Sequence, residues 1–285
     1  YGILMGGADV IPGVSGGTMA LIVGIYERLV GAVSTAVSFG LALARLRFDE
    51  ARAHWTEIPW RFLLPLIGGI GGAILVGARV IPPLMETYPH QMSGLFLGLV
   101  AASLIVPALR IERMTAVRWG LVVICAALAF FLVSLPVFEV STPSLLRVFL
   151  SASVSICAMI LPGISGAFLL KALGIYEPTL AALSAGDIVY VATFCAGAAV
   201  GLGAFAKLLD LLLSHRHDAT MAALIGLIAG ALRALWPWGS AERTLRLPGA
   251  DEPVVSVVLL ILAGFAGVVL LIGWSRRVNE TEPAV

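Results

Sequence analysis

Hydrophobic residues run along the chain in long blocks that are separated by short polar stretches. A helix that crosses a membrane needs about 20 mainly apolar residues, and blocks of this length recur throughout the sequence. The polar stretch at 44–61 is long enough for a short amphipathic helix at a membrane surface. The pattern predicts an all-α polytopic membrane protein.

The blocks divide the chain into two halves of the same design, 1–137 and 138–285. Each half opens with an apolar block that a polar, glycine-rich break interrupts, at about 1–38 and about 144–183. Three membrane spans are expected to follow in each half. They lie at about 62–84, 92–109 and 117–136, and at about 188–213, 219–237 and 254–274.

Matches between the halves indicate an internal repeat. Pro12 and Pro162 align with an offset of 150 residues (162 − 12). Further along, Gly98-Leu99-Val100-Ala101 matches Gly226-Leu227-Ile228-Ala229 with an offset of 128 (226 − 98), which also sets Arg79 opposite Lys207. Internal symmetry of this kind is typical of secondary transporters whose site lies at the repeat interface and uses broken helices.

The interrupted blocks either turn back as re-entrant hairpins or cross the membrane. Re-entrant blocks make the two repeats inverted and place ten loop arginines on one side against three on the other. Crossing blocks make the repeats parallel and divide the same arginines nine against four. Since cytoplasmic loops are enriched in Lys and Arg, the count favours inverted repeats with both termini cytoplasmic.

Composition supports a membrane location. The chain is 60% hydrophobic and only 12% charged, and its mean hydropathy is +1.02, whereas soluble domains carry about 25% charged residues. The three cysteines lie in apolar runs without the spacing of a metal site or a plausible disulfide. We find no nucleophile–base pair, metal-ligand spacing, nucleotide-binding loop or nucleic-acid motif, so neither an enzyme nor a resident cofactor is expected.

The two breaks share the pattern Pro-Gly-x-Ser-Gly and carry the most specific chemistry in the sequence. The pairs Pro12-Gly13 and Pro162-Gly163 are expected to end one helix and let another begin. Such a backbone is tolerated at membrane depth only where it is buried in protein or lines a wet cavity. The free N–H groups of the next helix favour anions, above all phosphate. The alternative is a pair of structural kinks for close helix packing.

Side chains near the breaks complete the expected phosphate site. Arg79 and Lys207 are repeat-matched cations, and Lys171 lies two turns beyond the second break. The alternative for these three is snorkelling to the headgroups, and Asp210, one turn after Lys207, is its expected ion-pair partner. The expected phosphate-binding residues are Ser15, Gly16, Gly17, Thr18, Ser165, Gly166, Lys171, Arg79 and Lys207.

Three acidic residues are candidates for coupling to H⁺ or Na⁺. Asp9 lies in apolar surroundings just before the first break, and ionisable groups inside membrane segments are functional candidates. Glu27 and Glu177 match each other after the motif Gly-Ile-Tyr. The alternatives are a helix-cap carboxylate for Asp9, and surface ion pairs or loop caps for the two glutamates.

These motifs resemble those of a known family. Gly-Ala-Asp-Val-Ile-Pro-Gly-Val-Ser-Gly-Gly-Thr at 7–18, Gly-Ile-Tyr-Glu-Arg at 24–28 and Leu-Pro-Gly-Ile-Ser-Gly at 161–166 resemble the PopT family of polyprenyl-phosphate translocases, over essentially the whole chain. The resemblance implies a plasma-membrane flippase that recycles undecaprenyl phosphate, the lipid carrier of envelope polymers. The second copy has Ala167-Phe168 in place of Gly17-Thr18, which weakens its expected role in phosphate binding.

The leading hypothesis is a lipid-phosphate transporter that works by cation-coupled alternating access. Its phosphate headgroup lies between the two breaks while the isoprenoid tail remains in lipid. The alternative is a secondary transporter that carries a small soluble anion through the same helix ends. An intramembrane lipid phosphatase is disfavoured because the sequence offers no nucleophile. The oligomeric state, the coupling ion and the transport direction do not follow from the sequence.

Overall fold

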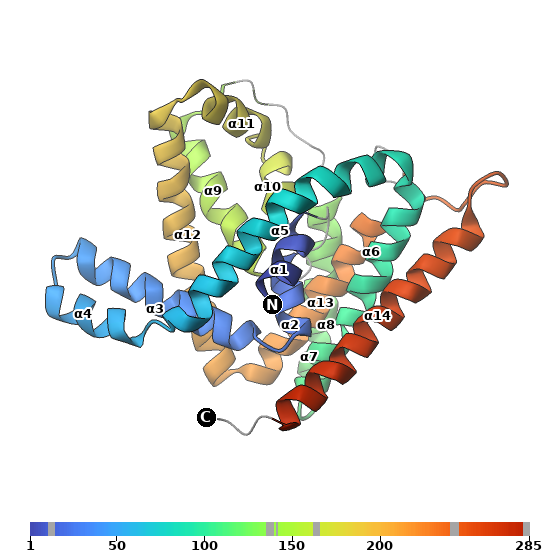
Figure 1. Cartoon of the computed structure of the whole chain (residues 1–285), viewed down its shortest axis with the longest axis horizontal. Helices are drawn as coiled ribbons and strands as arrows, with labels where there is room; N and C mark the ends of the chain where they lie inside the picture. Colours follow the sequence, from blue (N-terminus) through green and yellow to red (C-terminus); the bar gives the residue numbers. More distant parts are fainter. Residues whose placement is uncertain (11–14, 135–139, 141, 162–165, 240–244, 282–285) are drawn as a thin grey trace.

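The computed structural model describes residues 1–10, 15–134, 140, 142–161, 166–239 and 245–281. Within these ranges the secondary structure is helical apart from one isolated β-bridge between Gly239 and Leu245 (Figure 1). The expected all-α class is confirmed. Pro12, Gly13, Pro162, Gly163 and Ser165 lie outside the described residues.

The helices follow the long apolar blocks. The first half contains α1 (Gly2–Asp9), α2 (Gly16–Ile22), α3 (Tyr26–Ala44), α4 (Phe48–Glu57), α5 (Trp60–Thr87), α6 (Pro89–Ser103), α7 (Ile105–Arg110) and α8 (Ala116–Val133). The second contains α9 (Leu145–Ile160), α10 (Gly166–Ala172), α11 (Tyr176–Ala185), α12 (Ile188–His215), α13 (His217–Ala231), the 3₁₀-helix η1 (Leu232–Leu235) and α14 (Val254–Thr281).

The protein is a multi-pass membrane protein. Among the described residues, seven helical segments are long and apolar enough to cross a bilayer, including Tyr26–Ala44, the second arm of the first interrupted block. Large apolar side chains point outward from them; Leu75 on α5 is 69% exposed and Leu270 on α14 is 73% exposed. A surface of this kind suits contact with lipid rather than with water.

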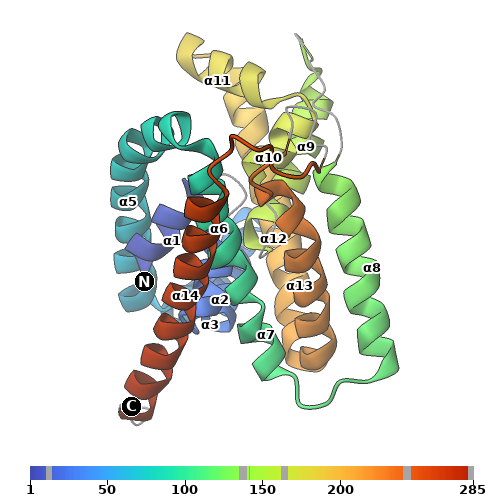
Figure 2. The same cartoon turned by 90° about the vertical axis from the view of Figure 1, so that its right-hand side faces the viewer.

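The two halves interlock. Helix α6 of the first half packs along α14 of the second, and α13 of the second half packs along α8 of the first (Figure 2). Glycines allow both contacts, because a Cβ atom at Gly98 would collide with the carbonyl of Ile261, and one at Gly226 with the carbonyl of Val122. Helix α3 of the first half also packs against α12 of the second, whereas α1 with α5 and α9 with α12 pack within one half.

Both interrupted blocks contain the same turn. Helix α2 ends with hydrogen bonds from Gly24 N to Leu21 O (3.2 Å) and from Ile25 N to Ala20 O (2.9 Å), and α10 ends with the corresponding pair of bonds at Gly174. This is the Schellman motif, which needs a left-handed residue; Gly24 has φ 80° and Gly174 has φ 75°. The motif Gly-Ile-Tyr-Glu therefore marks a turn and the start of α3 or α11.

The blocks lie in different parts of the molecule. Figures 1 and 2 place α11 at one end, with the loop that leads into α14 nearer that end, and α7 toward the opposite end. Helix α9 descends from the α11 end to the centre, where α2 contacts it. The first break and the end of α9 thus meet inside the protein.

Candidate functional site

The centre of the candidate site is the contact between the first break and the end of α9. Ser15 is the N-cap of α2, and its hydroxyl oxygen accepts a hydrogen bond from Gly17 N at 3.1 Å. The same hydroxyl donates to the carbonyl oxygen of Met159 at 3.1 Å. Ser15 is only 3% exposed, so this one side chain caps a helix and joins the two halves.

Asp9 occupies the start of α2. Its Oδ1 accepts a hydrogen bond from Gly16 N at 2.6 Å, so the carboxylate lies where a helix N-terminus favours negative charge. A Cβ atom at Gly16 would lie 2.6 Å from Oδ2 of Asp9, and one at Gly17 would lie 2.6 Å from the carbonyl of Ile160. Glycine at both positions permits these approaches.

A cavity of about 280 Å³ adjoins this contact. Asp9, Gly16 and Gly17 form part of its lining, and the other lining side chains are apolar. They come from α1, α3, α5, α9 and α12. The site therefore combines one carboxylate and a helix start with a wall that suits hydrocarbon.

The second break is described only from Gly166 onward. A Cβ atom at Gly166 would lie 2.8 Å from the carbonyl of Ser155 and would collide with the side chain of Met159. Lys171 is exposed, and its ammonium lies 4.8 Å from the ring centroid of Tyr176. Thr18, on the first-break side, is almost fully buried at 1% exposure.

The structure does not bring the expected cations into direct contact with the break. Arg79 and Lys207 are both exposed, and neither forms an ion pair within the described part of the chain. Their helices do pass close by: a Cβ atom at Gly77 would lie 3.0 Å from Val10, and Ala206 lines the Asp9 cavity. The predicted ion pair between Lys207 and Asp210 is wrong.

Glu27 and Glu177 have different surroundings. Glu27 Oε1 lies 2.6 Å from Nη1 of Arg110 and 3.3 Å from Nε2 of His217. Glu177 is exposed and has no hydrogen-bond or ion-pair partner among the described residues. Neither Arg110 nor His217 was predicted to contact Glu27, because nothing local in the sequence links either residue to it.

Tyr26 is a second residue that the sequence analysis missed. It is fully buried, and its hydroxyl donates to the carbonyl oxygen of Ile160 at 3.3 Å. Together with Ser15 it fixes the first interrupted block to the last turn of α9. The signal was present in the repeated motif Gly-Ile-Tyr-Glu, which had served to match Glu27 with Glu177 and to support the family resemblance.

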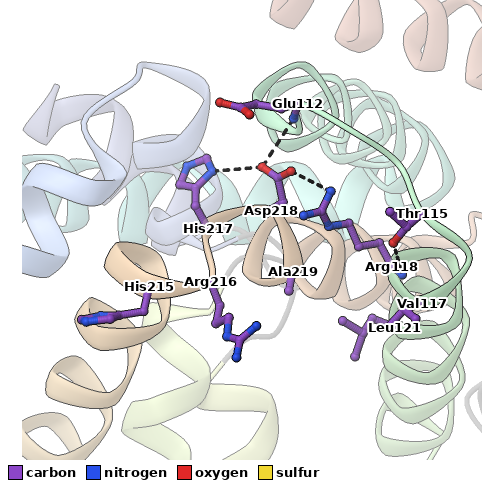
Figure 3. A pocket seen from close by; sticks show the side chains of 10 residues that line it. All are labelled: Glu112, Thr115, Val117, Arg118, Leu121, His215, Arg216, His217, Asp218 and Ala219. Carbon is purple, nitrogen blue, oxygen red and sulfur yellow. Dashed lines mark hydrogen bonds and ion pairs between the residues drawn. The ribbon is translucent and has the colours of Figure 1, made fainter.

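A further cavity, of about 500 Å³, lies at the α7 end of the molecule (Figure 3). Asp218 is its best-anchored side chain: it pairs with Arg118 at 2.8 Å and accepts from Glu112 N at 3.4 Å. His217 Nδ1 approaches the same carboxylate at 3.7 Å. These bonds join the loop between α7 and α8 to the start of α13. Among the described residues, no cluster of His, Cys, Asp and Glu could hold a metal ion.

Comparisons with known proteins converge on one family. Residues 5–249 match the family described as VCA0040-like, undecaprenyl phosphate translocase-like. A polyprenyl-phosphate transporter of Vibrio cholerae is 35% identical over 238 residues, which cover 83% of this chain and 76% of that protein. A polyprenyl-phosphate transporter of Staphylococcus aureus is 27% identical over 254 residues, covering 83% and 84%. No solved structure matches.

Proposed function

Because the chain belongs to the VCA0040-like, undecaprenyl phosphate translocase-like family, we propose that it moves polyprenyl phosphate, specifically undecaprenyl phosphate, across the plasma membrane. The observation that carries the proposal is the contact between the first break and the end of α9. It sets a helix start and a carboxylate beside an apolar cavity. The helix start suits a phosphate monoester and the apolar wall suits its long hydrocarbon tail, once the carboxylate is neutralised.

The proposed architecture is a pair of inverted repeats with re-entrant hairpins. One support is the repeated turn at Gly24 and Gly174. A second is that each half packs one helix on the other half, α6 on α14 and α13 on α8. A third is that α7 and α11 lie at opposite ends of the molecule. The arginine-rich loops around α7 would face the cytoplasm, as would both termini. Alternating access would follow from movement of one repeat against the other.

Asp9 has a defined role in this scheme. The N–H groups that open α2 are engaged by Asp9 and Ser15, so a phosphate reaches Gly16 only when the carboxylate leaves. H⁺ or Na⁺ bound to Asp9 would neutralise it and free the helix start. Inward movement of an anion opposes the membrane potential by about 2.3 kcal/mol per charge per 100 mV, and a cation that travels with it offsets this cost.

Arg79 and Lys207 are proposed as the phosphate-neutralising cations. Both are exposed on helices that pass beside the break, and an arginine binds phosphate with two parallel hydrogen bonds. Lys171, Ser165 and Gly166 would complete the site when the second break approaches.

The test measures binding of undecaprenyl phosphate to purified protein in detergent. Alanine at Arg79 or Lys207 is expected to abolish binding, while Arg52→Ala, an exposed arginine on α4, leaves it unchanged. Size-exclusion chromatography checks that each variant remains folded. Unchanged binding in both variants contradicts the site. Inorganic phosphate that binds as tightly as the lipid would instead favour a transporter of a small soluble anion.

A further inference from the structure

The two interrupted blocks have the same turn but are packed differently. Helix α2 packs against α6, α7, α9 and α14, whereas α10 makes its extensive contacts, within the described residues, only with α9 and α11. Ala20 of α2 is fully buried, and the repeat-matched Leu170 of α10 is partly exposed. Helix α2 is therefore surrounded by helices of both halves, whereas the extensive contacts of α10 stay within its own half.

The side chains at the matched turns repeat this asymmetry. Tyr26 is fully buried and bonds to Ile160, and Glu27 contacts Arg110 and His217. Tyr176 is only partly buried, and Glu177 is exposed without a described partner. The motif Gly-Ile-Tyr-Glu and its turn are the same in both blocks, although the helices before them differ in sequence. The different contacts of the two tyrosines and the two glutamates therefore come from what surrounds each turn rather than from the motif itself.

We propose that Tyr26 and Glu27 are positioning residues that hold the transporter closed on the α7 side, and that transport exchanges their contacts for matching contacts of Tyr176 and Glu177. The inference rests on the proposed function and names the residues that control access to its site. With the 150-residue offset (162 − 12), Ile160 corresponds to Val10. In the opposite state, the hydroxyl of Tyr176 donates to the carbonyl of Val10.

The strength of the contacts suits a reversible gate. Glu27 is 47% exposed, and Arg110 is 27% exposed at its side chain. Ion pairs with this exposure add little stability, so the closed state is favoured only modestly and the opposite state remains accessible. Under this assignment the structure is open toward the α11 side, which the arginine distribution places outside the cell.

The experiment measures access to α2 from the α7 side. Ala20→Cys is introduced into a protein whose three native cysteines are replaced by alanine, and inside-out vesicles are labelled with a membrane-impermeant maleimide. Glu27→Gln is expected to raise the labelling rate roughly two- to fivefold, because it removes the charge that holds Arg110. Tyr26→Phe, which removes the hydrogen bond to Ile160, should also raise the labelling rate.

Two variants control for general loosening. Glu177→Gln should leave the labelling of the cysteine at position 20 unchanged, since Glu177 contacts no partner among the described residues. The charge exchange Glu27→Arg with Arg110→Glu should restore slow labelling by rebuilding the ion pair. Leu170→Cys, the matched reporter, should be labelled from the opposite side of the membrane.

Each result decides between the alternatives. Unchanged labelling in both Glu27→Gln and Tyr26→Phe, or an equal rise in Glu177→Gln, overturns the gate. The labelling assay contains no lipid phosphate, so its result does not depend on the substrate. If the labelling rates change as expected but the protein does not bind undecaprenyl phosphate, the gate is supported and the proposed substrate is wrong.

Discussion

The hydroxyl of Ser15 donates to the carbonyl oxygen of Met159 at 3.1 Å, across 144 residues of sequence. Ser15 belongs to the first break, and Met159 lies in the last turn of α9, just before the second break. The first break is thus joined by a direct hydrogen bond to the helix that leads into the second. This contact underlies both the proposed phosphate site and the proposed gate.

Ser15→Ala tests the structural value of this bond. The change removes the N-cap of α2 and the link to Met159, so we expect the free energy of unfolding to fall by about 1–2 kcal/mol. Thermal unfolding in detergent measures the loss. Ser38→Ala is the control, because that hydroxyl donates to Ser34 O within one helix. Equal effects of the two changes would mean that the bond to Met159 adds nothing.

Asp9→Asn tests competition between the carboxylate and the phosphate. Asparagine can still accept from Gly16 N, but it carries no charge at the helix start. We expect tighter binding of undecaprenyl phosphate together with transport that no longer depends on the H⁺ or Na⁺ gradient. Binding assays in detergent and flux assays in proteoliposomes report these two effects. Weaker binding would show that Asp9 assists the phosphate rather than displaces it.

Alanine at Gly98 or Gly226 tests the interlocked helices. The added methyl group would collide with the carbonyl of Ile261 or of Val122, and overpacking of this kind costs about 1–3 kcal/mol. Each change should lower the melting temperature in detergent. Gly120→Ala, on α8 with open space around it, should instead be neutral or slightly stabilising. If Gly120→Ala lowered the melting temperature as much as the other two changes, the packing explanation would be ruled out.

The loop before α14 should be sensitive to acid. The hydrogen bond from Arg246 lowers the pKa of Glu252, and the bond from Gly249 N acts in the same direction. The carboxylate therefore stabilises the fold above the ordinary glutamate pKa of about 4.3, and this contribution is lost as pH falls through the lowered value. The melting temperature of the wild type should exceed that of Glu252→Gln at pH 6, and the difference should shrink steadily as the pH falls below the ordinary glutamate pKa. A difference that stays constant through the acid titration would contradict the assignment.

The helical class followed from the sequence because about 20 apolar residues are a long and specific signal. The breaks were also visible, since Pro-Gly inside an apolar run has few structural solutions. The tertiary partners of the polar groups, in contrast, could not be predicted. Ser15 with Met159 and Glu27 with Arg110 are tertiary contacts, and no local spacing encodes them.

The cations show a second limit. Arg79 and Lys207 aligned in the repeat, and facing the cavity was the favoured reading. Which way a side chain points depends on how its helix is rotated by packing, and both side chains are exposed in the structure. For Asp9 the structure shows the helix-start contact that had been the alternative, because a carboxylate in apolar surroundings must find donors and Gly16 N is close in sequence; its role in coupling stays a prediction.

The packing of α6 on α14, between the two halves, also constrains the order of assembly. Helix α6 leaves the ribosome long before its partner α14 is synthesised, so its glycine face has no protein to cover it during most of membrane insertion. The first half alone lacks this packing partner, and the glycine face of α6 is covered only when α14 arrives. A nascent chain that stops before α14 would present that uncovered face to quality-control proteases, even though every residue of the first break had already been made.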